Sequence, residues 1–414
     1  MYAPFANLRL TGKMGRVLTT HLIAEKLCFE KPITMPRHRT VGEQTAGRTK
    51  RIWTASSTVK SDWTFHQIAP YIGRMKTSMA RALILDNSKK GDLIVDPFCG
   101  SGAVALEAFA SNRGVVAGDW NPYAVLLTRA KLFAPKSEQA ALKRLTATWK
   151  LSRELLPKQD LRKVPTWVRR FFHQNTLRSA LAFRDACVER GDDFLLGCLL
   201  GILHHQRPGF LSFPSSHLVP YLRSRKFPKN QFASLYEERE VLPRLQAKIL
   251  RTYKRPIHNR GLTRRIHRVD ARHFPRPKQI SAVITSPPYM NELDYVRDNR
   301  LRLWFIERSL PKGLELVARD REAAFRELMR SVCARLAPNI KKGGKFVLVV
   351  GDATRGSGRK GRTGAITRQL FTEDDAFKEF HLEKSYQDKI PDVRRSRREC
   401  KGTRSETILV YRKH

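Results

Sequence analysis

The chain has 414 residues and carries 79 Lys and Arg against 38 Asp and Glu, a formal net charge of +41. This length allows one large domain or two to three smaller ones, and the charge is far beyond what solubility requires. The charge implies a polyanionic partner. Nucleic acid is favoured over a membrane because the basic residues are spread over the whole chain. A basic surface that only faces solvent is the alternative.

The cysteine and apolar patterns argue against a metal site, a disulfide framework and a membrane span. The six cysteines show no CxxC or Cys/His ligand spacing. The longest apolar run, residues 194–203, is shorter than the roughly 18 to 20 residues needed to cross a bilayer. No short apolar segment with a cleavage site begins the chain. We therefore expect a cytoplasmic protein with no metal and no membrane partner.

The first residues of the chain differ in composition from the remainder of the sequence. Residues 1–60 are rich in Lys and Arg and have little hydrophobic periodicity, so we interpret them as a basic arm able to follow phosphates. From residue 65 to 87 apolar residues recur at helical spacing, after a turn at Pro70 and Gly73. This pattern predicts a helix just before the first strand.

Residues 93–119 combine strand patterns with a glycine loop. Residues 93–95 predict a short buried strand, which is followed by the loop DPFCGSG and a helical pattern. Residues 114–117 predict a second strand, which leads to Gly118 and Asp119 and then to another helical pattern. Strand, glycine loop, helix, strand and acid form the opening half of a doubly wound α/β sheet.

The regular alternation stops after this half and resumes later. Residues 134–265 are mostly helical in pattern and rich in Arg and Lys, with an irregular stretch at 207–227, and we interpret them as a helical insertion that is a candidate for DNA binding or target recognition. Five more strands are predicted at residues 266–269, 281–285, 345–350, 380–386 and 407–411. One seven-stranded α/β domain, in two parts at 61–133 and 266–414, is therefore expected.

The DPFCGSG loop lies where a backbone can approach a ligand closely. Gly100 and Gly102 flank the turn, and the free N–H groups of the following helix point at whatever the loop binds. The GxGxxG fingerprint is absent, so pyrophosphate is not the natural occupant. A purely structural turn is the alternative.

Two acids follow strands of this sheet. Asp119 ends the second strand, where a carboxylate can accept both hydroxyls of a ribose. Its alternative role is a helix N-cap. Asp270 ends the strand predicted at 266–269 and is placed to accept a hydrogen bond from an adenine amino group, with a similar alternative.

The most specific element is Thr285-Ser286-Pro287-Pro288-Tyr289, directly after a predicted strand. Two prolines remove backbone donors and fix φ, so the carbonyls of Ser286 and Pro287 can project into a cavity as acceptors for an amino group. Such acceptors draw the delocalised lone pair of an arylamine toward a nucleophilic form. Tyr289 can stack on a base rotated out of its helix. A structural Pro-rich turn is the alternative.

These motifs resemble the DNA amino-methyltransferases, which modify cytosine N4 or adenine N6. The FCGSG loop at 98–102 is similar to the cofactor loop of that family, and SPPY at 286–289 is similar to its target-amine tetrapeptide. Residues 66–75 resemble the segment that closes over the methionine end of the cofactor. The resemblance covers residues 65–133 and 266–412 and implies a Rossmann-like, seven-stranded S-adenosylmethionine-dependent methyltransferase fold with a helical insertion.

The resemblance also assigns roles to individual residues. It implies that S-adenosylmethionine is the cofactor and that it is held by Asp96, Pro97, Phe98, Gly100, Gly102, Asp119 and Asp270. It implies that the catalytic residues are Ser286, Pro287, Pro288 and Tyr289. The partner is then duplex DNA with its target base flipped out, and a companion restriction nuclease is left open. Serine at the first tetrapeptide position is similar to the N4-cytosine group, so cytosine N4 is favoured.

The chain departs from the family layout, and other functions stay open. The insertion follows the second strand, which is not a usual target-recognition position, so the segment that reads sequence is not identified. Methylation of an RNA base is one alternative, and a non-catalytic DNA-binding protein with a degenerate fold is another. Methylation at cytosine C5 is disfavoured because it needs a thiolate after proline, and no Pro-Cys pair exists. Cys99 is expected to have a packing role.

Two further groups of residues have less specific patterns. His204 and His205 are adjacent, so on a helix they point in different directions and make a poor metal pair. Arginines at 394, 395, 397 and 398 form either a solvated loop or a phosphate clamp. The sequence favours neither interpretation of these arginines over the other.

Overall fold

The computed structural model describes residues 62–216, 219–257, 261–288, 295–309, 321–354, 360–361, 363–389 and 405–414. Contacts divide the chain into residues 1–43 and 44–414, and every described residue belongs to the second unit. The predicted basic arm, Tyr289 and the arginines at 394–398 lie outside the described residues. Across the described ranges, no helix is both long enough and apolar enough to span a membrane.

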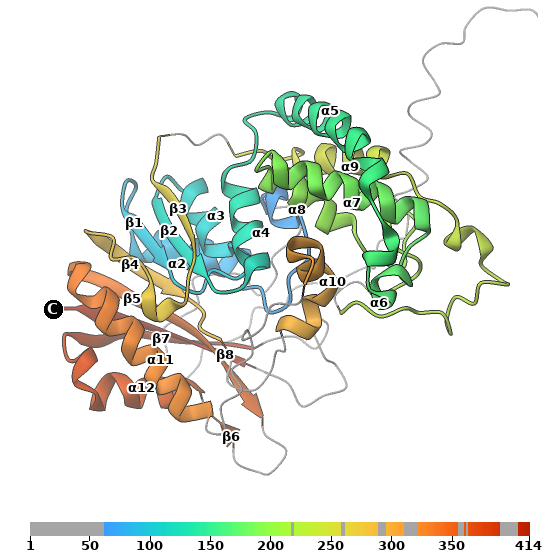
Figure 1. Ribbon diagram of the computed structural model, residues 1–414. Coiled ribbons are helices and arrows are strands. Elements are labelled where there is room, and N and C mark those ends of the chain that lie inside the picture. Colours follow the sequence, from blue (N-terminus) through green and yellow to red (C-terminus); the bar gives the residue numbers. More distant parts are fainter. Residues whose placement is uncertain are drawn as a thin grey trace, which may run out of the picture. The chain divides into compact units, whose positions relative to one another are not determined.

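A mixed β-sheet forms the centre of this unit (Figure 1). Its main strands are β1 Leu93–Asp96, β2 Gly114–Asp119, β3 Arg264–Arg268, β4 Ile280–Thr285, β5 Ile340–Thr354, β7 Phe380–Lys389 and β8 Ser405–Lys413. They run in the order β3-β2-β1-β4-β5-β8-β7, with the short β6 (Lys360–Gly361) paired to β5. Among these seven strands, β8 runs antiparallel to its two neighbours, β5 and β7. The other neighbouring pairs are parallel. The predicted seven-stranded Rossmann-like fold is confirmed.

Helices cover both faces of the sheet, and successive strand residues point to opposite faces. Ile94 and Val347 belong to one hydrophobic core, whereas Val95 and Phe346 belong to the other. The first core includes α2 (Thr77–Asn87), α3 (Ala103–Ala110) and α4 (Pro122–Leu132), and the second includes α11 (Arg321–Leu336) and α12 (Thr363–Glu373). The result is a three-layer α/β/α arrangement, as Figure 1 shows.

The predicted helical insertion lies between β2 and β3. Its helices are α5 Glu138–Leu155, α6 Thr166–Arg169, α7 Gln174–Glu189, α8 Asp193–Ile202 and α9 Val241–Thr252, with short 3-10 turns η2 Leu156–Lys158, η3 Leu161–Lys163 and η4 Ala233–Tyr236. Helix α8 packs closely on α4, because a β-carbon added at Gly197 would lie 2.9 Å from the β-carbon of Ala130. Buried residues of the insertion therefore belong to the same core as α2, α3 and α4.

The remaining elements connect these layers. Helix α10 (Tyr295–Glu307) follows the proline tetrapeptide and packs against α4 and α7. Short 3-10 turns are η1 Thr64–Gln67, η5 Ala271–His273, η6 Ala337–Asn339 and η7 Asp375–Phe377. The helix predicted after the turn at Pro70 and Gly73 is confirmed as α2, which ends shortly before β1. Gly73 has a φ of 75°, a conformation that favours glycine, and η1 precedes this turn.

Candidate active site

The glycine loop after β1 has the backbone conformation that its sequence predicts. Gly100 and Gly102 have φ values of 46° and 70°, the left-handed region that favours glycine. A β-carbon added at Gly102 would lie 2.6 Å from Oγ1 of Thr128 on α4, so this position also needs glycine for close packing. At Gly100 an added β-carbon would lie 3.4 Å from the ring of Tyr71. Tyr71 therefore lies against the loop.

Asp119 connects the end of β2 to the glycine loop. Its Oδ2 accepts a hydrogen bond from the Gly100 amide and its Oδ1 accepts one from the Asn121 amide, both at 2.9 Å. A carboxylate at this place, at the end of β2, suits the hydroxyls of a ribose. Burial raises the pKa of Asp119 to about 6. The N-cap of α4 is Asn121, which accepts from the Tyr123 amide, so the alternative helix-cap role for Asp119 is wrong.

Asp96 connects the glycine loop to the proline tetrapeptide. The Thr285 hydroxyl donates to Oδ1 of Asp96 at 2.6 Å, and the Phe98 amide donates to the same oxygen at 3.3 Å. Burial raises the pKa of Asp96 to about 7, against the effect of the Thr285 hydrogen bond. Strands β1 and β4 are parallel neighbours, so the segments that follow them leave the same edge of the sheet. The described part of the tetrapeptide therefore begins beside the glycine loop.

The other predicted site residues occupy different environments. Pro97 and Pro287 are buried, whereas Phe98, Ser286 and Pro288 are partly exposed. Asp270 caps η5 and not a strand end, because β3 ends at Arg268. The oxygens of Asp270 accept hydrogen bonds from the backbone amide and the guanidinium of Arg272, with a closest N–O distance of 2.6 Å. The hydrogen bond with the Arg272 side chain lowers the pKa of Asp270. Contact of Asp270 with adenine stays a prediction.

Glu107, which the sequence analysis missed, fixes the segment that lies over the glycine loop. This fully buried carboxylate on α3 is 2.9 Å from Nε2 of His66 and 2.8 Å from Nε of Arg81. It thereby joins the start of the 66–75 segment and α2 to the helix that begins at the glycine loop. The signal was present in the sequence: a single acid in the apolar helix AVALEAFA must find partners if it is buried.

A buried contact between aromatic rings and a cation connects the same segment to α10. The Tyr123 hydroxyl donates to the Pro70 carbonyl at 2.6 Å, and the Tyr123 ring lies 5.8 Å from the Tyr71 ring. The guanidinium of Arg302 on α10 lies 5.8 Å from the Tyr123 ring centroid, within the range of a cation–π interaction. The helix that follows the tetrapeptide therefore touches the residues that position Tyr71.

Cys99 and His204 have structural environments. Cys99 is buried in the glycine loop with its Sγ 3.4 Å from Oγ1 of Thr128, and burial raises its pKa, so it packs and does not act as a thiolate. Nδ1 of His204 is 2.8 Å from the Ser216 carbonyl. Among the residues that the structure describes, no group of three or more His, Cys, Asp or Glu side chains is arranged to hold a metal ion.

Several solved structures are similar to this chain at low sequence identity. TrmN from Thermus thermophilus is 13% identical with a TM-score of 0.35, over 84% of this chain and 52% of that chain. The rRNA methyltransferase aviRa from Streptomyces viridochromogenes is 12% identical with a TM-score of 0.35, over 88% of this chain and 96% of that chain. This chain thus spans about half the length of TrmN. No curated protein matches the sequence.

A family comparison gives a more specific result. Residues 28–129 match the sequence model of a family described as DNA methylase. The match includes the glycine loop and Asp119. The loop glycines lack side chains and have a left-handed conformation, and the Asp119 carboxylate is bonded to the loop, an arrangement that fits a nucleoside cofactor. This part of the chain, about a quarter of its length, is therefore similar to the DNA methylase family.

Proposed function

We propose that this protein transfers a methyl group from S-adenosylmethionine to the exocyclic amino group of a base in DNA, with cytosine N4 as the favoured acceptor. The hydrogen bond from Thr285 to Asp96 carries the proposal. It ties the tetrapeptide proposed to hold the target amine to the loop proposed to hold the cofactor. Holding both reactants at one edge of the sheet supplies the proximity that a one-step transfer needs.

The residues of the chain have separate tasks in this proposal. When bound, the cofactor supplies an electrophilic methyl group. Asp119 and the glycine loop hold its nucleoside part, and Asp270 contacts its adenine. The Ser286 hydroxyl and the Ser286 and Pro287 carbonyls accept hydrogen bonds from the target amine. No strong base is needed, because the amine loses its proton only after its nitrogen has become cationic.

The choice of target rests on different observations from the choice of chemistry. The family match supports DNA, and serine at the first tetrapeptide position supports cytosine N4. The net charge of +41 suits RNA equally well. Adenine N6 in DNA and a base in RNA are therefore the alternatives that an experiment must distinguish.

Analysis of modified nucleosides tests the proposal directly. The purified protein is incubated with S-adenosylmethionine and either duplex DNA or structured RNA, and the digested product is analysed by mass spectrometry. We expect N4-methylcytosine from DNA. N6-methyladenine would identify the sister specificity, and methylation of RNA alone would favour the RNA alternative. 5-Methylcytosine would contradict the proposed mechanism.

A further inference from the structure

The connection between α8 and α9 is long, irregular and basic. From His204 to Tyr236 the sequence contains five Lys and Arg residues and no Asp or Glu. In its described residues, the only helical element is the single turn η4 and the only strand-like pairing is the bridge between Ser215 and Leu222. Connections of this length within a compact unit are uncommon and are usually functional.

The described part of this connection is folded against itself and against the insertion. Arg239 is only 4% exposed, and its guanidinium donates to the carbonyls of Phe210, Ser212 and Leu235 at 2.6 to 2.7 Å. The Arg223 amide donates to the Pro214 carbonyl at 2.9 Å. A buried cation that satisfies three carbonyls holds the two ends of the connection together.

The connection is also attached to the helix that follows the tetrapeptide. Arg300 on α10 donates to the Pro220 carbonyl at 3.0 Å, and its guanidinium lies 5.4 Å from the ring of Trp167 on α6. The residues at 219–222 are therefore held at α10, whose first residue, Tyr295, comes shortly after the tetrapeptide at 286–289.

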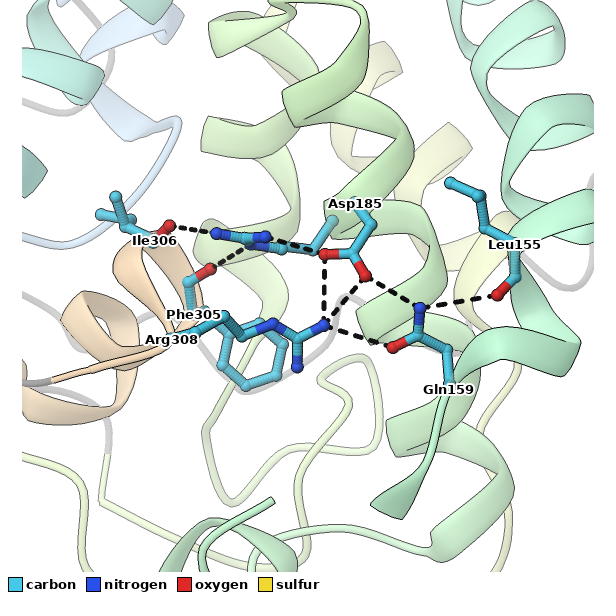
Figure 2. A network of polar contacts seen from close by, with 7 residues as sticks. Leu155, Gln159, Asp185, Phe305, Ile306 and Arg308 are labelled. Carbon is cyan, nitrogen blue, oxygen red and sulfur yellow. Dashed lines mark hydrogen bonds and ion pairs between the residues drawn. The ribbon is translucent and has the colours of Figure 1, made fainter. Parts of the chain in front are cut away.

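A second set of contacts fixes the other end of α10 to the insertion (Figure 2). Arg308 donates to both oxygens of Asp185 on α7 at 3.0 and 3.1 Å and to Gln159 at 3.2 Å. Arg184 donates to the Phe305 carbonyl at 2.7 Å. Although burial opposes ionisation of Asp185, its hydrogen bonds with Arg184 and Gln159 keep its pKa below the ordinary value. Helix α10 is therefore anchored to the insertion at two points.

The residues after Pro220 expose an aromatic ring and several cations. Tyr221 is 52% exposed, and Arg225, Lys226 and Lys229 are exposed. Within the described part of the chain, Tyr221, Arg225 and Lys229 make no side-chain hydrogen bond or ion pair, while the Lys226 ammonium lies 5.8 Å from the Phe227 ring. Unpaired cations beside an exposed aromatic ring suit a nucleic-acid backbone and an exposed base.

We propose that residues 220–229 form the DNA-contacting surface of the proposed active site. Arg225, Lys226 and Lys229 pair with phosphates that flank the target base, and the Tyr221 ring packs on an exposed nucleotide next to it. The inference rests on the proposed function. Duplex DNA is the partner because residues 28–129 match a family described as DNA methylase. The surface has only positive charge and is attached, through Arg300, to the helix that follows the tetrapeptide.

The test compares two triple variants that each remove three positive charges, one from the proposed surface and one from the edge of the sheet at the amino ends of β1 and β5. One combines Arg225→Ala, Lys226→Ala and Lys229→Ala. The control combines Lys89→Ala, Lys90→Ala and Lys342→Ala, exposed residues near the amino ends of β1 and β5, away from the glycine loop. Affinity for a short DNA duplex is measured over a range of salt concentrations, with calorimetry of S-adenosylmethionine binding and thermal unfolding as checks on folding.

We expect the first triple variant to weaken DNA binding at least tenfold and to reduce the slope of log K against log salt by about 2 to 3, because roughly 0.9 is lost for each phosphate contact. The control should change the slope by less than about 1. Tyr221→Ala should lower kcat/KM for DNA about tenfold, in the range of one lost stacking contact. All variants should keep the affinity for S-adenosylmethionine.

Different outcomes overturn different claims. If the wild-type protein methylates DNA but both triple variants bind it equally well, the surface is elsewhere and the proposed function stands. If the first triple variant loses binding to structured RNA, and the wild-type protein neither binds nor methylates DNA, then both DNA assignments fail.

Discussion

At the scale of single residues, Asp119 holds the glycine loop with the same carboxylate that is proposed to hold ribose. Asp119→Ala should weaken S-adenosylmethionine binding by roughly 1 to 3 kcal/mol, since both the hydroxyls and the Gly100 amide lose an acceptor. Asp119→Asn, which keeps one carbonyl oxygen, should lose less. Calorimetry measures both affinities, and an unchanged affinity in the alanine variant would remove the ribose assignment.

Ser286 and Tyr289 are expected to act on the target amine and base and not on the cofactor. Ser286→Ala and Tyr289→Ala should each lower the methylation rate about tenfold to a thousandfold, the range for the loss of one positioned polar or stacking group. The affinity for S-adenosylmethionine should stay nearly the same. A large loss of cofactor affinity in either variant would contradict their placement at the target base.

Asp96 makes the stability of the protein depend on pH. Its pKa is raised from 3.8 to about 7, so the folded state binds its proton more tightly than the unfolded state. This residue therefore disfavours folding increasingly as the pH rises from about 4 to about 7. The free energy of unfolding of Asp96→Asn, measured with denaturant and without cofactor, should therefore rise relative to that of the wild type by about 1 to 3 kcal/mol between pH 5 and pH 8. A pH-independent difference would show that Asp96 titrates normally.

Some site residues could be predicted from the sequence, and others could not. The glycines at 100 and 102 stand out because their left-handed conformation favours glycine. The prolines at 287 and 288 stand out because a Pro-Pro pair fixes φ and removes two backbone donors. Arg239 and Arg302 do not stand out, since their partners are distant in sequence and a basic chain offers many similar arginines. Asp270 is predicted to end a strand but instead caps η5, and its ion pair with Arg272 depends on this turn, which the pattern does not show.

At the scale of elements, α8 packs against the segment that carries Tyr71. A β-carbon added at Gly201 would lie 1.9 Å from the Ile68 carbonyl oxygen, so the helix touches that backbone directly. Gly201→Ala should reduce the free energy of unfolding by about 1 to 3 kcal/mol, the usual effect of overpacking. It should also weaken S-adenosylmethionine binding, because Ile68 leads into the segment over the glycine loop.

The matched control for this prediction is Gly209→Ala. Gly209 has no atom within 4 Å of an added β-carbon, so this variant should be nearly neutral in both measurements. Equal effects from Gly201→Ala and Gly209→Ala would show that the close contact at Ile68 does not limit stability. Denaturant unfolding and calorimetry provide the comparison.

Strands were easier to predict than the packing of the insertion. The buried strands β1, β2 and β4 are short apolar runs bounded by loops, and such runs are typical of a parallel sheet covered on both faces. The helical pattern of the insertion was correct, but periodicity does not reveal which helix a buried face meets. Only the structure shows that α8 packs on α4, where Gly197 approaches Ala130.

At the scale of the whole molecule, the net charge of +41 should dominate the thermodynamics of DNA binding. Each phosphate that is neutralised releases counterions, so log K should fall linearly and steeply with log salt. Fluorescence anisotropy with a labelled duplex between low and physiological salt measures the slope. Affinity that is independent of salt would show that the basic residues only face solvent.

The anchoring of the 204–240 connection has a consequence for how the proposed DNA-contacting surface can diversify. Its two ends join α8 and α9, whose buried residues Leu200 and Leu245 belong to the main core. The entropy of closing a loop grows only slowly with its length, so residues between these fixed ends can be exchanged or added at small cost. The glycine loop and the tetrapeptide remain in place meanwhile. Exchange of this connection should therefore change the affinity for DNA at the proposed surface and leave the binding of S-adenosylmethionine unchanged.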